Sequence, residues 1–385
     1  MNALAAALLL LAVFASLYHV TAAVCAVFFA RKSKSAKNSG PWPRATCLKP
    51  LCGEDFELTR NLESFLEQDY PCYDVICGVS DSLDPAYTAA SRVCSQSGAG
   101  RCRAVSGEVG NDANRKIRNL RNMDSHVPPE TEILVLSDSD IRVGSDYLKR
   151  MIAPLRDDPA AGATTALYRI ENAASAGAVI EALAVEATFA PGVLVAATFS
   201  HLRFAFGASI AVRRTHFAES GGFAAIEDYL ADDYQIGHRI FKLGKRVVLA
   251  PYVAAIYVEP EQSVRATISH LIRWNRTIRV CQPTGYFFSI LGNPVIWALA
   301  GGAALGPVAT AGAVLAVVLA TRIVTAAIVA ACLGSRRGIV RAGLSPLWDV
   351  LSALLWLVGF AGSRVIWRGV AYTILADGRL AEIHE

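Results

Sequence analysis

The stretch ILVLSDSDIRV, residues 133–143, decides the fold that we expect and the site built on it. Its apolar residues at 133–136 predict a short buried strand, after which the run breaks abruptly at Ser137. Asp138 and Asp140 follow at once, and the carboxyl ends of strands in a parallel α/β sheet face the ligand crevice. An Asp-x-Asp pair there suits Mg²⁺ or Mn²⁺, which prefer oxygen ligands and substrate phosphates. The alternative is an Asp-Ser turn that caps the next helix.

Strands and helices alternate on both sides of this stretch. The predicted strands cover residues 47–51, 73–79, 101–106, 133–136 and 246–252. The predicted helices cover residues 55–68, 85–97 and 144–156, with apolar residues at helical spacing. This alternation predicts an α/β domain with a doubly wound, mostly parallel sheet.

A second strand end in this domain also carries carboxylates. The strand at 73–79 runs into SDSLDP, which contains Asp81 and Asp84. Two acidic strand ends are what a nucleotide-diphosphate sugar needs: Asp81 or Asp84 accepts hydrogen bonds from the base or ribose, while Asp138 and Asp140 address ribose and metal. The alternative for SDSLDP is an Asx-Pro turn leading into a helix.

Basic residues open a further helix between these two acidic sets. Asn114, Arg115 and Lys116 begin it, and its amino-terminal N–H groups are placed to meet an anion. The alternative is a solvated basic face of the helix.

The segment IEDYLADDYQIGHRIFKLG, residues 226–244, adds one more acidic pair beside an apolar stripe. Asp232 and Asp233 are adjacent, so on a helix their side chains point about 100° apart and only one faces the crevice directly. We expect Asp233 to be that residue and to act as general base toward an acceptor hydroxyl. The alternative is an acid pair that answers the helix dipole.

Residues 264–280, VRATISHLIRWNRTIRV, predict a basic amphipathic helix containing Trp274 at a membrane surface. His270 and Arg273 are suited to clamp a leaving diphosphate, and Trp274 is suited to wall an acceptor pocket. Packing at the lipid surface alone is the alternative, and the two roles are compatible.

The chain as a whole has the composition of a membrane protein. Hydrophobic residues make up 53% of its 385 residues, and the mean hydropathy is +0.36. The net charge of +4, from 37 basic and 33 acidic residues, is too small to indicate nucleic-acid binding. Nine cysteines at irregular spacings, with no Cys-x-x-Cys pair, predict reduced thiols facing the cytosol and no zinc site.

Uncharged runs at both ends of the chain predict membrane segments. Residues 3–30 carry no formal charge and are followed by Arg31, Lys32, Lys34 and Lys37, which places the amino terminus outside and the α/β domain in the cytoplasm. A cleaved signal peptide is the less favoured alternative, because it would need a basic start and a shorter core. We expect a transmembrane helix at 1–31, a linker at 32–46, the α/β domain at 47–260, an amphipathic interfacial helix at 261–284, a transmembrane hairpin at 285–334, and a third apolar segment with a basic tail at 335–385.

Three details qualify this membrane topology. Glu181, Glu186 and Pro191 argue against a spanning helix at 175–199, which we expect to be interfacial or buried. Arg322, inside the hairpin, should face protein or snorkel. A full third crossing at 347–362 would put the basic tail outside, so we favour a re-entrant or interfacial segment there.

At this point the motifs resemble a known family. The chain resembles family 2 inverting glycosyltransferases of the GT-A fold, in the ceramide glucosyltransferase-like branch, over residues 49–283. The motifs are KPLCGEDFELTRNLESFLEQDYPCYDV, VSDSLDPA, SDSDIRVG, LADDYQIG and HLIRW. More narrowly, NRKIRNLRNM, SDSDIRVGSDYL and HLIRWNRTIR resemble the bacterial glycosyltransferases of hopanoid biosynthesis. His270 departs from the Gln or Arg of the wider family, which puts its leaving-group role in doubt.

The resemblance implies an activity and a membrane. It implies transfer of N-acetylglucosamine from UDP-GlcNAc to bacteriohopanetetrol, with the enzyme in the bacterial inner membrane and its catalytic domain in the cytoplasm. Ceramide glucosylation from UDP-glucose is the second reading, so the lipid partner is a hopanoid or a sphingolipid. A processive polysaccharide synthase should carry more spans, a flippase should lack the Asp-x-Asp, and a catalytically silent lipid-binding relative is left open.

The resemblance also implies roles for single residues. Asp81 or Asp84 would bind uridine, and Lys116 would contact the nucleotide. Asp138 and Asp140 would bind the nucleotide and its Mg²⁺ or Mn²⁺. Asp233 would be the general base, and Arg273 with Trp274 would line the diphosphate and acceptor site.

Overall fold

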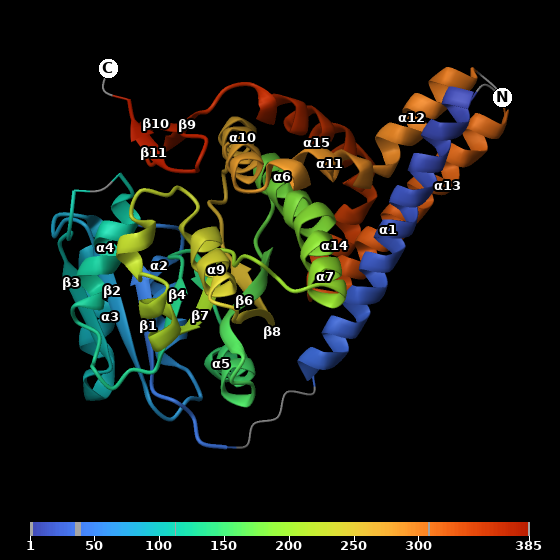
Figure 1. The fold of residues 1–385 in the computed structure, drawn as a ribbon. Coiled ribbons are helices and arrows are strands. Elements are labelled where there is room, and N and C mark those ends of the chain that lie inside the picture. Colours follow the sequence, from blue (N-terminus) through green and yellow to red (C-terminus); the bar gives the residue numbers. More distant parts are fainter. Residues whose placement is uncertain (1–2, 35–39, 112, 307–308, 384–385) are drawn as a thin grey trace. The chain divides into compact units, whose positions relative to one another are not determined.

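A computed structural model describes residues 3–34, 40–111, 113–306 and 309–383 of the chain (Figure 1). The chain forms two compact units. The sheet unit comprises Lys32–Asn172, Ser200–Glu259 and Tyr372–Glu385. The helical unit comprises Met1–Arg31, Ala173–Phe199 and Pro260–Ala371. Each unit is therefore assembled from segments that are distant in the sequence.

An eight-stranded sheet in the order β3-β2-β1-β4-β7-β6-β8-β5 forms the centre of the sheet unit. Its strands are β1 (Ala45–Pro50), β2 (Tyr73–Val79), β3 (Cys102–Ser106), β4 (Ile133–Ser137), β5 (Ile141–Arg142), β6 (Ala161–Ile170), β7 (Ser209–Arg213) and β8 (Arg246–Ile256). The pairs β1–β2, β1–β4, β2–β3 and β6–β8 are parallel, whereas β4–β7, β6–β7 and β5–β8 are antiparallel. The expected mostly parallel sheet is confirmed, with antiparallel pairings that the sequence analysis did not contain.

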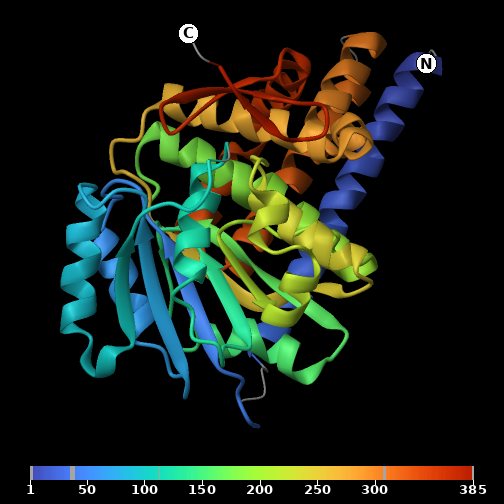
Figure 2. The ribbon, with the colours of Figure 1, turned by 60° about the vertical axis from the view of Figure 1, so that its left-hand side comes forward.

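Helices cover both faces of this sheet (Figure 2). They are α2 (Leu58–Leu66), α3 (Pro85–Gln96), α4 (Arg115–Asp124), α5 (Tyr147–Asp157), α8 (Arg214–Glu219) and α9 (Asp232–Lys242). Neighbouring residues of β2 show the two faces: the Cys77 thiol lies near Cys94 of α3, whereas Gly78 faces α4. A Cβ on Gly78 would lie 2.4 Å from Met123 Cγ, so only glycine allows α4 to pack this closely.

Two strands at the carboxyl end of the chain form a hairpin. Strand β10 (Val370–Ile374) pairs antiparallel with β11 (Leu380–Glu382), and the register places Tyr372 opposite Glu382 and Ile374 opposite Leu380. The residues from Tyr372 onward belong to the sheet unit. We refer to residues 372–382 as the C-terminal hairpin.

The helical unit contains the apolar segments. Its elements are α1 (Ala3–Lys34), α6 (Ala176–Ala184), the π-helix η2 (Val185–Phe189), α7 (Ala190–Phe199), α10 (Val264–Cys281), α11 (Pro283–Ser289), α12 (Pro294–Leu305), α13 (Ala309–Cys332), α14 (Arg336–Arg341), α15 (Ser345–Phe360) and β9 (Arg364–Trp367). Within the part of the chain that the structure describes, four helices are long and apolar enough to cross a membrane: Ala3–Ser33, Ala176–Phe199, Ala309–Cys332 and Arg336–Phe360. The pair Pro283–Gly292 and Pro294–Leu305, bent by 60°, meets the same criteria together.

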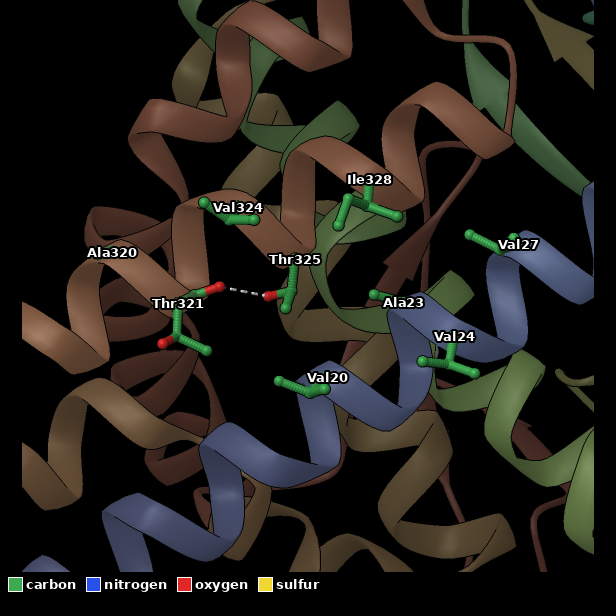
Figure 3. A pocket seen from close by; sticks show the side chains of 9 residues that line it. All are labelled: Val20, Ala23, Val24, Val27, Ala320, Thr321, Val324, Thr325 and Ile328. Carbon is green, nitrogen blue, oxygen red and sulfur yellow. Dashed lines mark hydrogen bonds between the residues drawn. The ribbon is translucent and has the colours of Figure 1, made fainter.

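Helices α1, α12 and α13 pack against one another in this unit. Ala12, Val295, Ala298 and Val318 form the buried contact among the three helices. A groove of about 450 Å³ lies between α1 and α13. Figure 3 shows the side chains that line it and a hydrogen bond between two of them, in which Thr325 Oγ1 donates to the Thr321 carbonyl at 2.8 Å. The groove is lined by Val20, Ala23, Val24, Val27, Ala320, Thr321, Val324, Thr325 and Ile328. Its walls are therefore almost wholly apolar.

A buried ion pair fixes the middle of α13. Arg322 is 1% exposed and binds both carboxylate oxygens of Asp349 at 2.8 Å. Its guanidinium also donates to the carbonyl of Ala187, inside the π-helix, at 2.8 Å. The expectation that Arg322 faces protein is confirmed, because each of these partners lies in the helical unit.

The cysteine expectation was wrong at one place in the sheet unit. Cys94, near the end of α3, is disulfide-bonded to Cys102 at the start of β3. The sequence contains no Cys-x-x-Cys signal for this bond, because helix and strand pack side by side and bring residues eight positions apart to a Cα–Cα distance of 4.7 Å.

Candidate active site

The Asp-x-Asp turn follows β4 and is held by side chains from two other elements. Lys49, the fifth residue of β1, donates from Nζ to the backbone carbonyl of Asp138. Asn61 of α2 donates to the carbonyl of Ser139 at 3.3 Å, and the Ser139 hydroxyl donates to Asp55. Three consecutive polar groups of the turn are thereby fixed before any ligand binds.

Lys49 is a charged residue inside a strand that is buried throughout. It is 0% exposed, and its ammonium lies 4.1 Å from the centre of the Phe65 ring. Burial lowers the pKa of Lys49 to about 8, against the opposing influence of the Asp140 and Asp138 charges. A buried cation therefore stands directly behind the two carboxylates.

Lys116 connects the Asp-x-Asp turn to the acidic helix α9. Asn114 caps α4 by accepting from the N–H of Ile117 at 3.2 Å, which sets the helix so that Lys116 lies in its first turn. Lys116 Nζ lies 2.9 Å from Asp138 Oδ1 and 3.0 Å from Asp232 Oδ2. Burial alone would lower the pKa of Lys116, but the two carboxylates outweigh burial and raise it. The side chain is thus a fixed cation between two acids.

Helix α9 begins with the two adjacent aspartates, and they differ in environment. Asp232 is buried and takes the ion pair with Lys116. Asp233 accepts from the backbone N–H of Tyr234 at 2.7 Å. Burial, followed by the charge of neighbouring Asp232, raises the pKa of Asp233 to about 7. A carboxyl group with a pKa near neutrality is suited to accept a proton from a hydroxyl.

Gly207 leaves room where Asp138 and Asp233 approach each other. A Cβ at this position would lie 3.1 Å from Asp138 Oδ2 and 3.3 Å from Asp233 Oδ2. Both carboxylates therefore border one small space that contains no side chain from residue 207. Predicted nucleotide, metal and base residues from three separate segments meet here: Lys116, Asp138 and Asp233.

The carboxylates of the site fit a metal that takes most of its ligands from elsewhere. Among the described residues, no group of three free ligand side chains lies close enough to hold an ion without help, because two of the three neighbouring cysteines, Cys94 and Cys102, are joined in the disulfide beside Cys77. Asp138 and Asp140 therefore supply two carboxylates, and Mg²⁺ ordinarily completes such a pair with water and substrate phosphates. The donor set fits Mg²⁺ or Mn²⁺ bound together with a diphosphate.

The two aspartates of SDSLDP differ in what they already bind. Asp84 caps α3 by accepting from the N–H of Ala86 at 2.9 Å, and both of its oxygens accept from the N–H of Gly53 at 3.0 Å. Asp81 is exposed and accepts from the N–H of Leu83 at 2.9 Å. The Asx-Pro turn considered from the sequence is therefore present at Asp84, and Asp81 keeps the more accessible carboxylate.

The third predicted set lies on α10, in the helical unit. His270 Nδ1 lies 3.4 Å from Glu181 Oε1, and its ring meets that of Trp274 edge to face at 4.6 Å. Trp274 also packs on a cluster from α6, α10 and α15 that contains Leu183, Leu271 and Trp348. Because α10 belongs to a different unit from the Asp-x-Asp, the diphosphate and acceptor roles of His270, Arg273 and Trp274 stay predictions.

Residues 4–380 match the family model described as glycosyl transferase family 21. The chain belongs to glycosyl transferase family 21. This family includes ceramide glucosyltransferase-like enzymes, so the protein is a glycosyltransferase with a GT-A-like fold. The matching family model is that of family 21, whereas the motifs in the sequence resembled glycosyltransferase family 2.

Solved structures of other glycosyltransferases are similar to this family 21 chain. A mannosyltransferase from Pyrobaculum calidifontis, in complex with GDP-Man and Mn²⁺, is 19% identical, with 91% of this chain and 99% of that chain covered and a TM-score of 0.49. Residues 1–349 of S. aureus TarS, in complex with UDP-GlcNAc, are 12% identical, with coverages of 89% and 100% and a TM-score of 0.40. Glucosyl-3-phosphoglycerate synthase from Mycobacterium tuberculosis, with Mg²⁺ and UDP, is 16% identical, with coverages of 63% and 82% and a TM-score of 0.36.

Sequence reasoning did not single out several residues that shape the site of this family 21 enzyme. Lys49 could have been found, since a charge inside an apolar strand is unusual. Asp55 and Asn61 gave no such signal, because polar residues at a helix start are common. Gly207 lies in a stretch without periodicity. It matters because the carboxylates of Asp138 and Asp233 approach it in space, which the sequence does not indicate.

Proposed function

We propose that this family 21 enzyme transfers a sugar from a UDP-sugar to a hydroxyl of a lipid, with inversion at the anomeric carbon. The observation that carries the proposal is the meeting of Asp138 and Asp233 above Gly207, with Lys116 beside them. This geometry supports the proposal, because Asp138 would contact the nucleotide and its metal while Asp233 is a carboxyl group suited to accept a proton.

In the proposed reaction Asp233 takes the proton of the acceptor hydroxyl while that oxygen attacks the anomeric carbon. A single displacement turns an α-linked donor into a β-glycoside. Asp138 and Asp140 would hold Mg²⁺ or Mn²⁺, which when bound stabilises negative charge on the departing diphosphate. Lys116 keeps Asp138 oriented and adds a positive charge on the nucleotide side. Asp81 is proposed to bind uridine, because Asp84 is engaged as a helix cap.

The proposed donor is UDP-GlcNAc and the proposed acceptor is bacteriohopanetetrol. The motifs NRKIRNLRNM and HLIRWNRTIR support this choice through their resemblance to the hopanoid branch. The family match supports the second candidate, glucosylation of ceramide from UDP-glucose, since family 21 includes ceramide glucosyltransferase-like enzymes. The two candidates share fold, site and mechanism and differ in the pockets for sugar and lipid.

We further propose a bacterial inner-membrane protein whose sheet unit is cytoplasmic. The basic residues after α1 support this orientation. The segment Ala176–Phe199 is proposed not to cross, because β6 before it and β7 after it pair in one sheet. A single crossing would force residues 200–208 back through the bilayer without helical hydrogen bonds.

The same reasoning limits the crossings between residues 260 and 371. The chain leaves the sheet unit at Glu259 and rejoins it at Tyr372, so an even number of crossings is proposed. The bent pair α11–α12 and helix α13 supply two, with α14 and α15 remaining at the cytoplasmic surface. The contacts of α15 support this choice, because Arg276 and Arg279 of the basic helix α10 donate to backbone carbonyls at residues 360–364, where α15 ends.

The test uses membranes that contain the full-length protein and either metal. Bacteriohopanetetrol and ceramide are offered as separate acceptors, each with UDP-GlcNAc and with UDP-glucose, and lipid products are read by mass spectrometry. We expect a GlcNAc-hopanoid that is lost with Asp233→Asn and retained with Asp157→Asn, a matched change at an exposed carboxylate. Detection of hexosyl-ceramide instead would overturn the proposed donor and acceptor but leave the proposed mechanism unchanged. Turnover by Asp233→Asn at the normal rate would overturn the assignment of the base.

A further inference from the structure

The C-terminal hairpin is attached to the sheet unit by an apolar face. Tyr372, Ile374 and Leu380 are only 2%, 4% and 6% exposed. Tyr372 and Ile374 are two positions apart on one strand and Leu380 lies opposite Ile374, so the three side chains share one face of the hairpin.

The hairpin binds the chain just before α9 through backbone hydrogen bonding. Arg379 and Tyr229 form an antiparallel bridge. The N–H of Leu380 donates to the carbonyl of Asp228 at 2.7 Å. Asp232 follows Tyr229 by three residues, so the bridge lies directly ahead of the acidic start of α9.

The same short segment is held on its other side by the cap of α4. The Asn114 side chain donates to the carbonyl of Tyr229 at 2.6 Å, and the Asn114 N–H donates to the carbonyl of Glu227 at 3.1 Å. Asn114 is also the residue that sets the first turn of α4, where Lys116 lies. Residues 227–229 therefore connect three structures: the hairpin, the helix of Lys116 and the helix of Asp233.

Side-chain packing alone does not hold this segment. A cavity of about 290 Å³ lies against the bridge, lined by Ala224, Ala225, Glu227, Asp228, Tyr229, Asp377 and Arg379. Arg379 and Asp377, two residues of the hairpin in this lining, form an ion pair with each other. The backbone bonds at Asp228 and Tyr229 link the hairpin directly to the segment.

We propose that the C-terminal hairpin is a positioning element of the active site, which holds Asp228 and Tyr229 so that Asp232 and Asp233 keep their places against Lys116 and Asp138. The inference rests on the proposed function, in which Asp233 is the base. A displacement of about 1 Å at a reacting group can reduce a rate about 10²-fold, so the hairpin acts on turnover without touching substrate.

The test compares three full-length variants at saturating lipid and varied donor concentration. Leu380→Pro removes the N–H that Asp228 accepts and also shortens the side chain. Leu380→Ala loses the side chain but keeps the N–H, and Glu382→Pro places the same ring two residues further along β11, beyond the Asp228 contact. For each variant, kcat, the KM of the donor, the pH profile and the thermal midpoint are measured.

We expect Leu380→Pro to lower kcat by about 10-fold or more, with the KM of the donor within about 2-fold and a displaced acid limb of the pH profile. Leu380→Ala should lower kcat by less than about 3-fold at a similar thermal midpoint, and Glu382→Pro should behave as wild type. Equal kcat values for Leu380→Pro and Leu380→Ala would overturn the inference even if Asp233→Asn is inactive. Activity of Asp233→Asn would instead remove its premise, so the two failures are distinguishable.

Discussion

Lys116 Nζ lies 2.9 Å from Asp138 Oδ1, although the two residues come from a helix start and a strand end that are 22 positions apart. The same ammonium lies 3.0 Å from Asp232, and its charge also lowers the pKa of Asp233. One cation thus acts on three acids of the site, of which Asp138 and Asp233 have roles in the proposed reaction.

Replacing Lys116 by Met should therefore change both rate and pH dependence. We expect kcat/KM to fall by about 10²-fold, the usual effect of losing one charge-stabilising group. The acid limb of the profile should move to higher pH, because removal of a positive charge favours protonated Asp233. Lys149→Met, at a surface pair with exposed Asp69, is the matched control. An acid limb at the wild-type position would contradict the assignment.

The raised pKa of Asp233 predicts how activity depends on pH. A base must be deprotonated, so kcat/KM should fall about tenfold per pH unit below its pKa of about 7 and level off above it. The measurement is kcat/KM of the free enzyme between pH 5 and 9. A profile that stays flat down to pH 5 would show that another group takes the proton.

The same pKa predicts a stability gain when Asp233 is replaced. Between the ordinary Asp pKa of 3.8 and about 7, the folded state binds a proton that the unfolded state has lost, so folding becomes less favourable as pH rises through this window. Asp233→Asn removes this titration and should raise the thermal midpoint by a few degrees at pH 8 and by less at pH 5. Equal shifts at both pH values would contradict the prediction.

From the surroundings of Gly207 we predict that its replacement by Ala lowers activity more than it lowers stability. Gly207→Ala would put a Cβ 3.1 Å from Asp138 Oδ2 and 3.3 Å from Asp233 Oδ2, and the flexible ends of these side chains would move aside. We expect a loss of kcat of about tenfold or more and a higher requirement for Mn²⁺ or Mg²⁺, at a nearly unchanged thermal midpoint. Gly144→Ala is the control, since its Cβ would meet the nearest atom at an ordinary 3.5 Å. Equal activity of Gly207→Ala and Gly144→Ala would contradict the conclusion that Asp138 and Asp233 border one space at Gly207.

The buried pair of Arg322 and Asp349 predicts a non-additive stability pattern. Arg322→Met alone leaves a buried carboxylate uncompensated, which should cost about 3–5 kcal/mol. The double variant Arg322→Met/Asp349→Leu should recover most of that cost, although the Ala187 carbonyl loses its donor. Thermal midpoints in detergent measure the effect, with Arg60→Ala, at an exposed ion pair with Glu57, as control. Additive losses of stability would show that Arg322 and Asp349 contribute independently.

The apolar runs and periodicities within single segments correctly predicted several strands and helices. Strand β2 was expected at residues 73–79 and is found there, because a mostly apolar run, interrupted only by Asp74, is bounded by turn residues on both sides. Helices α3 and α5 were placed within a few residues of their observed ends. Strand β6 was missed, since AGATTALYRI has small residues and no alternation, and β7 was missed beside the long apolar segment before it.

The candidate site was predictable in its residue types and less so in its partners. Acidic strand ends identify Asp138 and Asp140 without any knowledge of tertiary structure. The ion pair of Lys116 with Asp232 was not visible, because the two residues are 116 positions apart and share no motif. The sequence likewise did not predict that Asp84 accepts hydrogen bonds from the N–H groups of both Gly53 and Ala86, although the turn at Asp84 had been considered.

The return of the C-terminal hairpin to the sheet unit also sets an order of events during synthesis. Helix α1 is synthesised first, segments of the sheet unit and helices α6–α7 follow, and β11 is made after α10–α15. Leu380 can reach Asp228 only after helices α10–α15 have been translated. A nascent chain that stalls before the hairpin therefore lacks β11, and if the hairpin positions the site as proposed, transferase activity requires translation through α15 and the hairpin.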